Sequence, residues 1–400
     1  MSQAAALKPR LEQELKENIL GFWMKHTIDK KNGGFLGEID HAMNVHPEAE
    51  KSLVLNARIL WTFSTAYRMY KQEDYLKMAE RAYDYLTTHF VDNEHGGLYW
   101  MVDALGNPSQ DKKQIYGQSF AIYALSEYYR AAGHQEALEL AKELFHILEK
   151  HGYDPVHKGY IEALARDWKP TDNLSLSDKD LNEAKSMNTH LHVLEGYTNL
   201  YRVWKDEELR SKLSELIEVT LDHIVDPKTA HFFLFFDEEW NVKSDDISYG
   251  HDIEGSWLLF EAAEVLGNDQ LLARTREVAI AMAEATYNEG VDSDGGLLNE
   301  ANAEGLTDTN KDWWPQAEAV VGFYNAYQMT GEEKFAEAAV RSWNFIEEFI
   351  IDKKHGEWYW SVNREGVPQL HEMKVSAWKC PYHNSRACFE MIERLSKSEA

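Results

Sequence analysis

The chain has 400 residues, of which 44% are hydrophobic and 12% aromatic, so it can bury a large core. Its formal net charge of −27 argues against binding to nucleic acid or to an anionic membrane surface. No apolar run reaches membrane-spanning length, and residues 1–17 lack the apolar segment of a signal peptide. Two cysteines, Cys380 and Cys388, are too far apart for a disulfide if one helix carries both. These features predict a cytoplasmic protein.

A short motif of glycine followed by alternating aromatic or apolar residues recurs along the chain. Successive copies are spaced by roughly 60 to 72 residues, which indicates a repeat architecture. The alternation predicts a short strand, and the turn residues after it predict a hairpin. The fourth copy is degenerate and has lost its glycines. The six copies begin at Gly33, Gly96, Gly159, His231, Gly295 and Gly356.

Between the hairpins, apolar residues recur at three- and four-residue spacing, which is typical of amphipathic helices. Each interval has room for two helices, and many pairs are joined by a tight polar turn, as at Gly133 and Gly331. The sequence therefore predicts about twelve helices and an all-α fold. The predicted helices cover residues 7–26, 51–71, 75–90, 113–132, 134–150, 185–204, 207–225, 251–267, 269–288, 312–330, 333–351 and 382–396.

Twelve helices in six antiparallel pairs fit an (α/α)6 barrel with short β-hairpins, closed into a single catalytic domain of residues 1–400. An open solenoid also satisfies the repeat, but it needs atypical capping units at both ends. The last repeat is instead rich in polar, site-like residues, so we expect closure. The even-numbered helices then point their N-termini at one end, together with the hairpins. Such an end favours a developing oxyanion and is the predicted active-site end.

Three histidines lie near these helix starts. His251 and Glu254 are three residues apart on one helix face, so the carboxylate could orient the imidazole. A pair of this kind is more often simply solvated, but His192 and His383 occupy similar positions in other helices. His192 also shares a helix face with Asn188. Together they predict a site for proton transfer near neutral pH.

Other candidates are an arginine, a tyrosine and two tryptophans. Arg58 lies in an apolar helix face, where it must be paired or reach a polar cavity. Tyr116 begins the next even-numbered helix, and Trp314 and Trp378 lie near the last two. Each has a structural alternative: a buried ion pair, a buried hydrogen bond or a place in the core. Aromatic faces beside a polar cavity, however, suit stacking on sugar rings.

Several other chemistries fit the sequence less well. The three histidines and Glu254 could hold zinc, but the histidines come from three separate helices and match no zinc motif, so we expect no metal. No nucleophile elbow is present. An inverting glycosidase on this barrel needs two opposed carboxylates. Histidines at the candidate positions favour proton transfer at carbon instead.

Five motifs occur along the chain: Asn56–Trp61, Asn188–His192, Gly250–Glu254, Trp313–Glu318 and Trp378–Asn384. Together they resemble the N-acylglucosamine 2-epimerase superfamily, and within it the cellobiose 2-epimerases. The resemblance runs over essentially the whole chain, and it implies a cofactor-free reaction at C2 of a reducing-end glucose, giving mannose. The implied substrates are β-1,4-linked disaccharides such as cellobiose or lactose.

The resemblance also implies catalytic roles at the matching positions. His251 and His383 would flank C2 and exchange its proton from opposite faces. His192 would assist ring opening or hold O1, with Asn188 nearby. Glu254 would orient His251.

The remaining implied roles concern charge and substrate binding. Arg58 would stabilise the enediolate, and Tyr116 would contact the reacting sugar. Trp314 and Trp378 would stack on sugar rings, and Asp180 would reach the sugar from a lid-like loop.

Two alternatives stay open at this point. One is the same chemistry on N-acylglucosamine, mannobiose or a monosaccharide, including aldose–ketose isomerisation. The other is a non-catalytic carbohydrate-binding protein with the same barrel. The expected partner is a small-molecule sugar, with no nucleic acid and no membrane, and the chain is expected to be a monomer or a weak homo-oligomer.

Overall fold

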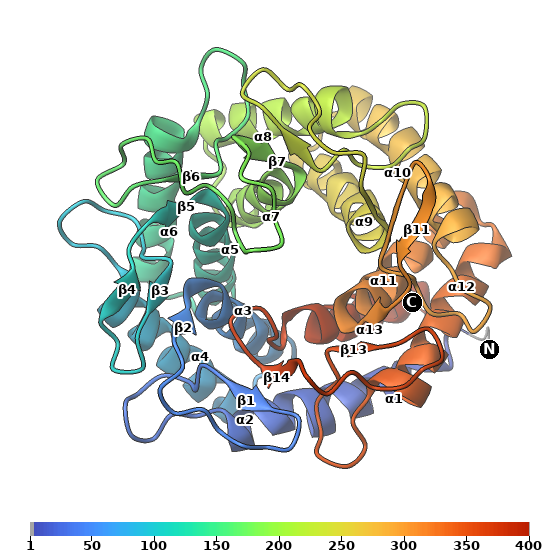
Figure 1. Cartoon of the computed structure of the whole chain (residues 1–400), viewed down its shortest axis with the longest axis horizontal. Coiled ribbons are helices and arrows are strands. Elements are labelled where there is room, and N and C mark those ends of the chain that lie inside the picture. Colours follow the sequence, from blue (N-terminus) through green and yellow to red (C-terminus); the bar gives the residue numbers. More distant parts are fainter. Residues whose placement is uncertain (1–3, 400) are drawn as a thin grey trace.

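The computed structural model describes residues 4–399, so residues 1–3 and 400 of the predicted domain lie outside the described part. Two concentric rings of helices surround a common axis (Figure 1). The inner helices are α3 (Leu53–Tyr70), α5 (Ile115–Ala132), α7 (Met187–Val203), α9 (Tyr249–Leu266), α11 (Trp313–Thr330) and α13 (Tyr382–Glu399).

The outer ring alternates with the inner one along the chain, and most of its helices include a π-helical segment (η). These elements are α1 (Leu7–Gln13), η1 (Glu14–Leu20), α2 (Gly21–His26), α4 (Glu73–Tyr85), η2 (Leu86–Phe90), α6 (Gln135–Ile147), η3 (Leu148–Gly152), α8 (Glu207–Val219), η4 (Thr220–Ile224), α10 (Asp269–Glu289), α12 (Glu333–Phe345) and η5 (Ile346–Ile350). Over the described residues, these segments and the inner helices match the twelve predicted ranges to within three residues at every end.

The barrel is closed, as predicted. β1 (Ile39–Asp40) pairs antiparallel with β14 (Met373–Val375), which joins the first repeat to the last. Arg10 of α1 donates a hydrogen bond to Glu347 of η5 at 3.0 Å. The first and last helices accordingly lie side by side (Figure 1). These contacts exclude the open solenoid.

Short strands ring the end of the barrel at which the inner helices begin. Within this ring, β2 pairs with β3, β5 with β6, β7 with β8, β9 with β10, and β12 with β13. The strand before each inner helix therefore pairs with the next hairpin along the ring. The remaining strands are β2 (Lys51–Ser52), β3 (Met101–Val102), β4 (Pro108–Gln110), β5 (Lys113–Gln114), β6 (Ala163–Leu164), β7 (Lys185–Ser186), β8 (Phe235–Phe236), β9 (Ile247–Ser248), β10 (Glu300–Asn302), β11 (Gly305–Asp308), β12 (Lys311–Asp312) and β13 (Ser361–Val362).

The glycine motif itself forms a turn with a single β-bridge, and the predicted strand begins only after it. In the second repeat Val91 bridges Leu98, and β3 starts at Met101. The reason is backbone conformation: Gly96 and Gly97 have φ angles of 78° and 72°, a left-handed conformation that favours glycine and turns the chain.

A buried ion pair fastens most of the hairpins. In five repeats of the described chain, the lysine before an inner helix pairs with an aspartate of a hairpin, as Lys51 does with Asp29 at 2.8 Å. In the fourth repeat Ile247 takes the place of that lysine. The side chain of His231 instead lies between carboxylates. The other lysine–aspartate pairs are Lys113–Asp92, Lys185–Asp154, Lys311–Asp292 and Lys374–Asp352.

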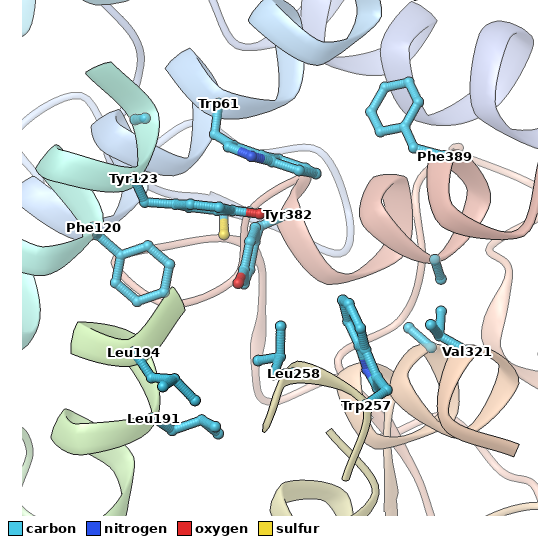
Figure 2. Close-up of a cluster of buried hydrophobic side chains, with 14 of the residues drawn as sticks. Trp61, Phe120, Tyr123, Leu191, Leu194, Trp257, Leu258, Val321, Tyr382 and Phe389 are labelled. Carbon is cyan, nitrogen blue, oxygen red and sulfur yellow. The ribbon is translucent and has the colours of Figure 1, made fainter. Parts of the chain in front are cut away.

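The hydrophobic core draws on both rings of helices, and side chains from all six inner helices meet inside the inner ring (Figure 2). Trp61 of α3 stacks on Tyr123 of α5, with 5.3 Å between ring centroids and 14° between planes. Tyr382 of α13 meets Trp61 edge-on at 5.5 Å. Burying large aromatic rings from separate helices stabilises the ring as one unit.

Two further expectations concern cysteine and membranes. Cys380 and Cys388 are both buried and free of disulfides. In the part of the chain that the structure describes, no helix combines the length and the apolar character needed to cross a bilayer.

Candidate active site

The predicted histidines meet at the hairpin end of the barrel. His251 lies at the start of α9 and His383 at the start of α13, although 132 residues separate them in sequence. The ring of Trp314, at the start of α11, lies 4.6 Å from that of His251 and 5.4 Å from that of His383. One indole therefore contacts both imidazoles.

The other predicted residues continue this cluster around the barrel. The His192 ring lies 4.9 Å from that of Tyr116. Arg58 donates a hydrogen bond from Nη2 to the Tyr116 hydroxyl at 3.0 Å. The Trp378 ring lies 5.6 Å from that of Tyr116. Inner helices α3, α5 and α7 and the segment before α13 thus bring these four residues together.

Each histidine has a defined partner on Nδ1. In His383, Nδ1 lies 2.6 Å from a carboxylate oxygen of Glu318, and in His192 it lies 2.8 Å from one of Glu195. In His251 the partner is the Ser248 hydroxyl, at 2.7 Å. Within residues 4–399, the Nε2 atom of each ring makes no hydrogen bond. All three Nε2 atoms are accessible to solvent. Nε2 is therefore the atom free to meet a substrate.

Glu254 does not orient His251, contrary to the sequence prediction. It is fully buried and accepts a hydrogen bond from Arg386 at 2.8 Å. The guanidinium of Arg386 also bonds to Glu195 and Glu318. A shared helix face brings His251 and Glu254 to the same side of α9, but the buried cation on α13 takes the carboxylate.

Burial keeps the imidazoles neutral near pH 7. It lowers the pKa of His251 to about 3 and that of His383 well below its usual value. Burial also lowers the pKa of His192, although its partner Glu195 opposes the shift. Burial alone would raise the pKa of Glu195, but the charge of Arg386 and the hydrogen bonds with His192 and Tyr382 together outweigh burial and bring that pKa to about 2. Neutral imidazoles with a free Nε2 are suited to act as bases.

Two predicted residues, Asn188 and Asp180, make no direct contact with the three histidines in the described chain. The side-chain oxygen of Asn188 is buried and has no hydrogen-bond partner in the described chain. Asp180 lies in the loop between β6 and β7 and accepts a hydrogen bond from Ser177 at 2.6 Å. His190 points away from the cluster, as expected, and its Nε2 accepts the backbone N–H of Tyr160.

Glu254, Glu318 and His383 form the one group in the described chain with metal-ligand spacing, their ligand atoms lying within 4.8 Å of one another. Arg386 donates hydrogen bonds to both of these carboxylates. A guanidinium already supplies the positive charge that a metal ion would bring there. The donor set therefore fits an arginine-centred network better than a metal site.

Four residues that hold the histidines or their carboxylate partners were not predicted from the sequence. They are Ser248, Glu195, Glu318 and Arg386. A signal for two of them was present, because Glu195 follows His192 by three residues and Arg386 follows His383 by three. Charged residues on the apolar faces of inner helices need partners. Which helix supplies each partner depends on the closed barrel, and helical periodicity does not give it.

A cavity of about 580 Å³ lies at the opposite end of the barrel. The C-terminal halves of the inner helices line it. Ion pairs such as Arg68–Glu127 and Arg202–Glu261 join neighbouring helices there. It contains none of the residues predicted for the site. We therefore place the chemistry at the hairpin end, where neutral histidines, an arginine and half-buried tryptophans meet.

Known proteins resemble this chain over almost its whole length. The profile of the family described as N-acylglucosamine 2-epimerase (GlcNAc 2-epimerase) matches residues 34–387. The cellobiose 2-epimerase of Bacteroides fragilis is 47% identical over 387 residues, covering 96% of this chain and 98% of the relative. That of Ruminococcus albus is 41% identical over 385 residues, with 96% and 98% covered.

A solved structure shows the same likeness in three dimensions. The structure of the cellobiose 2-epimerase from Bacillus thermoamylovorans matches with a TM-score of 0.93 at 43% identity, covering 97% of this chain and 99% of that one. The fold is therefore the (α/α)6 barrel of these epimerases. With a family match across residues 34–387 and relatives above 40% identity over nearly full length, the chain belongs to the N-acylglucosamine 2-epimerase family.

Proposed function

We propose that this protein is a cofactor-independent isomerase of the cellobiose 2-epimerase type. It interconverts reducing-end glucose and mannose in β-1,4-linked disaccharides such as cellobiose and lactose. The observation that carries the proposal is the pair of neutral imidazoles, His251 and His383, placed against one Trp314 ring with Nε2 free. The full-length likeness to cellobiose 2-epimerases supports the choice of substrate.

Epimerisation at C2 requires an open-chain aldehyde, because the carbonyl at C1 makes the C2 proton acidic. One histidine takes that proton, and the electron pair of the C2–H bond forms an enediolate. The second histidine then returns a proton to the opposite face of C2. Inversion needs two bases on opposite faces, which His251 and His383 provide from separate helices. His192 assists ring opening or holds O1.

The enediolate carries negative charge that the site must stabilise. Arg58 supplies a buried cation, and its contact with Tyr116 places a hydroxyl next to it. In a buried site such a charge acts far more strongly than in water. Arg58 is therefore the proposed electrostatic stabiliser, and Tyr116 the proposed contact of the reacting sugar.

Three further residues act by holding the bases in place. Glu318 and Glu195 accept Nδ1–H of His383 and His192, so that Nε2 of each ring is the unprotonated nitrogen. Arg386 bonds to both carboxylates and to Glu254 and fixes their positions. Catalysis depends on such placement, because even a small misalignment of a base slows proton transfer.

Binding of the sugar rings is assigned to residues at the hairpin end of the barrel. Trp314 and Trp378 are half-buried and can stack on sugar rings, while Asn188 and Asp180 supply polar groups from the start of α7 and the loop before it. The buried unpartnered oxygen of Asn188 is an acceptor for a sugar hydroxyl. Both free, buried cysteines are consistent with a reducing compartment, and the cytoplasm is the proposed location.

The test is incubation of the purified protein with cellobiose in D2O, without added metal, followed by NMR. Deuterium at C2 together with a new mannose-type anomeric signal supports the proposal. Exchange with N-acetylglucosamine or free mannose, but not with cellobiose, keeps the chemistry and changes the substrate. No exchange with any sugar, despite binding, favours a carbohydrate-binding protein.

A further inference from the structure

Three inner helices begin with a serine N-cap, and one of these caps differs from the others. In each helix the serine oxygen accepts the backbone N–H three residues on, a bond that stabilises a helix start. The distance is 2.9 Å for Ser52 of α3 and 3.1 Å for Ser186 of α7. For Ser248 of α9 it is 3.4 Å, near the limit of a hydrogen bond.

The Ser248 hydroxyl is closer to an imidazole than to the backbone it caps. Its oxygen lies 2.7 Å from Nδ1 of His251. The hydroxyls of Ser52 and Ser186 instead contact acceptors on other segments, a backbone carbonyl and a buried carboxylate. In α9, therefore, the cap is long and the contact with the ring is short. No other described residue bonds to this nitrogen of His251.

A hydroxyl and a carboxylate affect an imidazole differently. The carboxylates of Glu318 and Glu195 favour the protonated ring of the histidine that each one holds, because opposite charges attract. A hydroxyl is neutral, and it can accept from Nδ1–H or donate to a bare Nδ1. His383 thus has an anionic partner and His251 a neutral one, although both contact Trp314.

We propose that Ser248 is a positioning residue for the reaction: its hydroxyl holds His251 by Nδ1 and leaves it the weaker base of the pair, the one that gives a proton back to carbon most readily. This inference rests on the proposed epimerase function. In the step concerned, the Nε2–H bond of protonated His251 breaks, and the electron pair of the enediolate forms the new C2–H bond. The imidazole becomes neutral and keeps Nδ1–H, which the Ser248 oxygen accepts.

The test compares deuterium uptake in Ser248→Ala with that in the natural protein, starting from cellobiose and, separately, from its 2-epimer in D2O. Without the hydroxyl, return of the proton from His251 slows, so kcat falls by about 10- to 100-fold while KM changes little. The enediolate then persists, and His383 more often returns a proton to the face of C2 from which it first removed one. From one of the two epimers, deuterium in recovered substrate therefore rises relative to deuterium in product.

From the other epimer, His251 acts first as the base, and this ratio falls, because deuterium returns to recovered substrate through the slowed His251. These opposite shifts separate a positioning role from a general loss of structure, which slows both reactions and leaves both ratios unchanged. Ser248→Thr keeps a hydroxyl and restores both the rate and the ratio. Ser248→Gly removes the hydroxyl and costs less capping stability than alanine does, so it repeats the test if the alanine variant folds poorly.

A matched control is Asn268→Ala, which removes the side-chain cap of the outer helix α10. The Asn268 oxygen accepts the N–H of Leu271 at 3.0 Å, away from the histidines. This variant loses helix stability and leaves the deuterium ratio unchanged. The inference is overturned if Ser248→Ala and Ser248→Gly keep the natural rate, or lose rate while the ratios from both epimers stay unchanged. Absence of C2 exchange in the natural protein would overturn the epimerase function itself.

Discussion

The guanidinium of Arg386 donates a hydrogen bond to Glu254 at 2.8 Å. The Glu254 carboxylate is therefore bound to Arg386 and not to His251 on its own helix. The same guanidinium bonds to Glu318 and Glu195, the partners of His383 and His192. One buried cation thus links the two carboxylates that hold histidines on α7 and α13.

Replacing this cation should destabilise the protein strongly. Arg386→Met leaves three buried carboxylates without their partner, which costs about 3 to 5 kcal/mol in the free energy of unfolding. Urea denaturation measures the loss. Arg274→Met is the control, since Arg274 pairs with Asp222 on the surface, where an ion pair contributes less than about 1 kcal/mol. Equal losses in both variants would show that the network carries no special weight.

Removing the negative charge of Glu318, the partner of His383, should slow proton transfer and leave sugar binding intact. Glu318→Gln keeps the shape of the side chain and an acceptor for Nδ1–H, but it no longer stabilises the protonated ring. We expect kcat to fall by about 10- to 100-fold. Steady-state kinetics with cellobiose measures kcat and KM separately. Glu261→Gln, which alters the Arg202 pair at the opposite end, should leave both values near normal.

The two tryptophans should differ in what they recognise. Trp314 contacts both His251 and His383, so Trp314→Ala should impair disaccharides and monosaccharides alike. Trp378 lies beside Tyr116 and Trp100 and is proposed to stack on a sugar ring. Trp378→Ala should therefore raise KM for cellobiose more than for a monosaccharide. Equal effects of Trp378→Ala on both substrates would argue against the disaccharide assignment.

The degenerate fourth repeat should make stability depend on alkaline pH. The His231 side chain lies 2.7 Å from Asp252 and 2.9 Å from Glu289. Burial lowers its pKa, but the two carboxylates outweigh burial and raise it to about 9. Because the pKa in the folded state is above the usual value, the stabilisation is complete below about pH 6.5 and is lost as pH rises through about 9.

His231→Asn removes this charge and should cost about 2 to 3 kcal/mol of unfolding free energy at pH 6. Above pH 10 the variant and the natural protein should converge, apart from a constant difference in packing. Urea denaturation at several pH values measures both. A difference that does not change with pH would mean that the pKa of His231 is the same in the folded and the unfolded protein.

The fold was largely predictable from the sequence because each repeat has a recognisable local sequence pattern. Helical periodicity and turn residues gave the twelve segments, and the spacing of the glycine motif gave the six units. Closure followed from the polar last repeat, and the pairing of β1 with β14 confirms it. The glycine motif was misplaced as a strand because its positive φ angles, which make it a turn, are invisible to an alternation pattern.

The site was predictable only in part. His192, His251 and His383 were expected to meet because topology alone gathers the starts of the inner helices. The partner of His251 was predicted incorrectly because spacing along α9 shows which side chains share a face, not which of them a neighbouring helix will take. Contacts such as Arg386 with Glu254 join residues on different helices, and only the packed barrel determines them.

The most direct test of the two-histidine account is His383→Asn, measured for turnover of cellobiose and for its binding by calorimetry. Asparagine can still donate hydrogen bonds to Glu318 but cannot accept a proton from carbon. Epimer formation should fall by at least about 100-fold while the dissociation constant for cellobiose changes by only a few-fold. Turnover of His383→Asn at the natural rate would show that His383 is not one of the two bases, since C2 would then lose its proton to some other group.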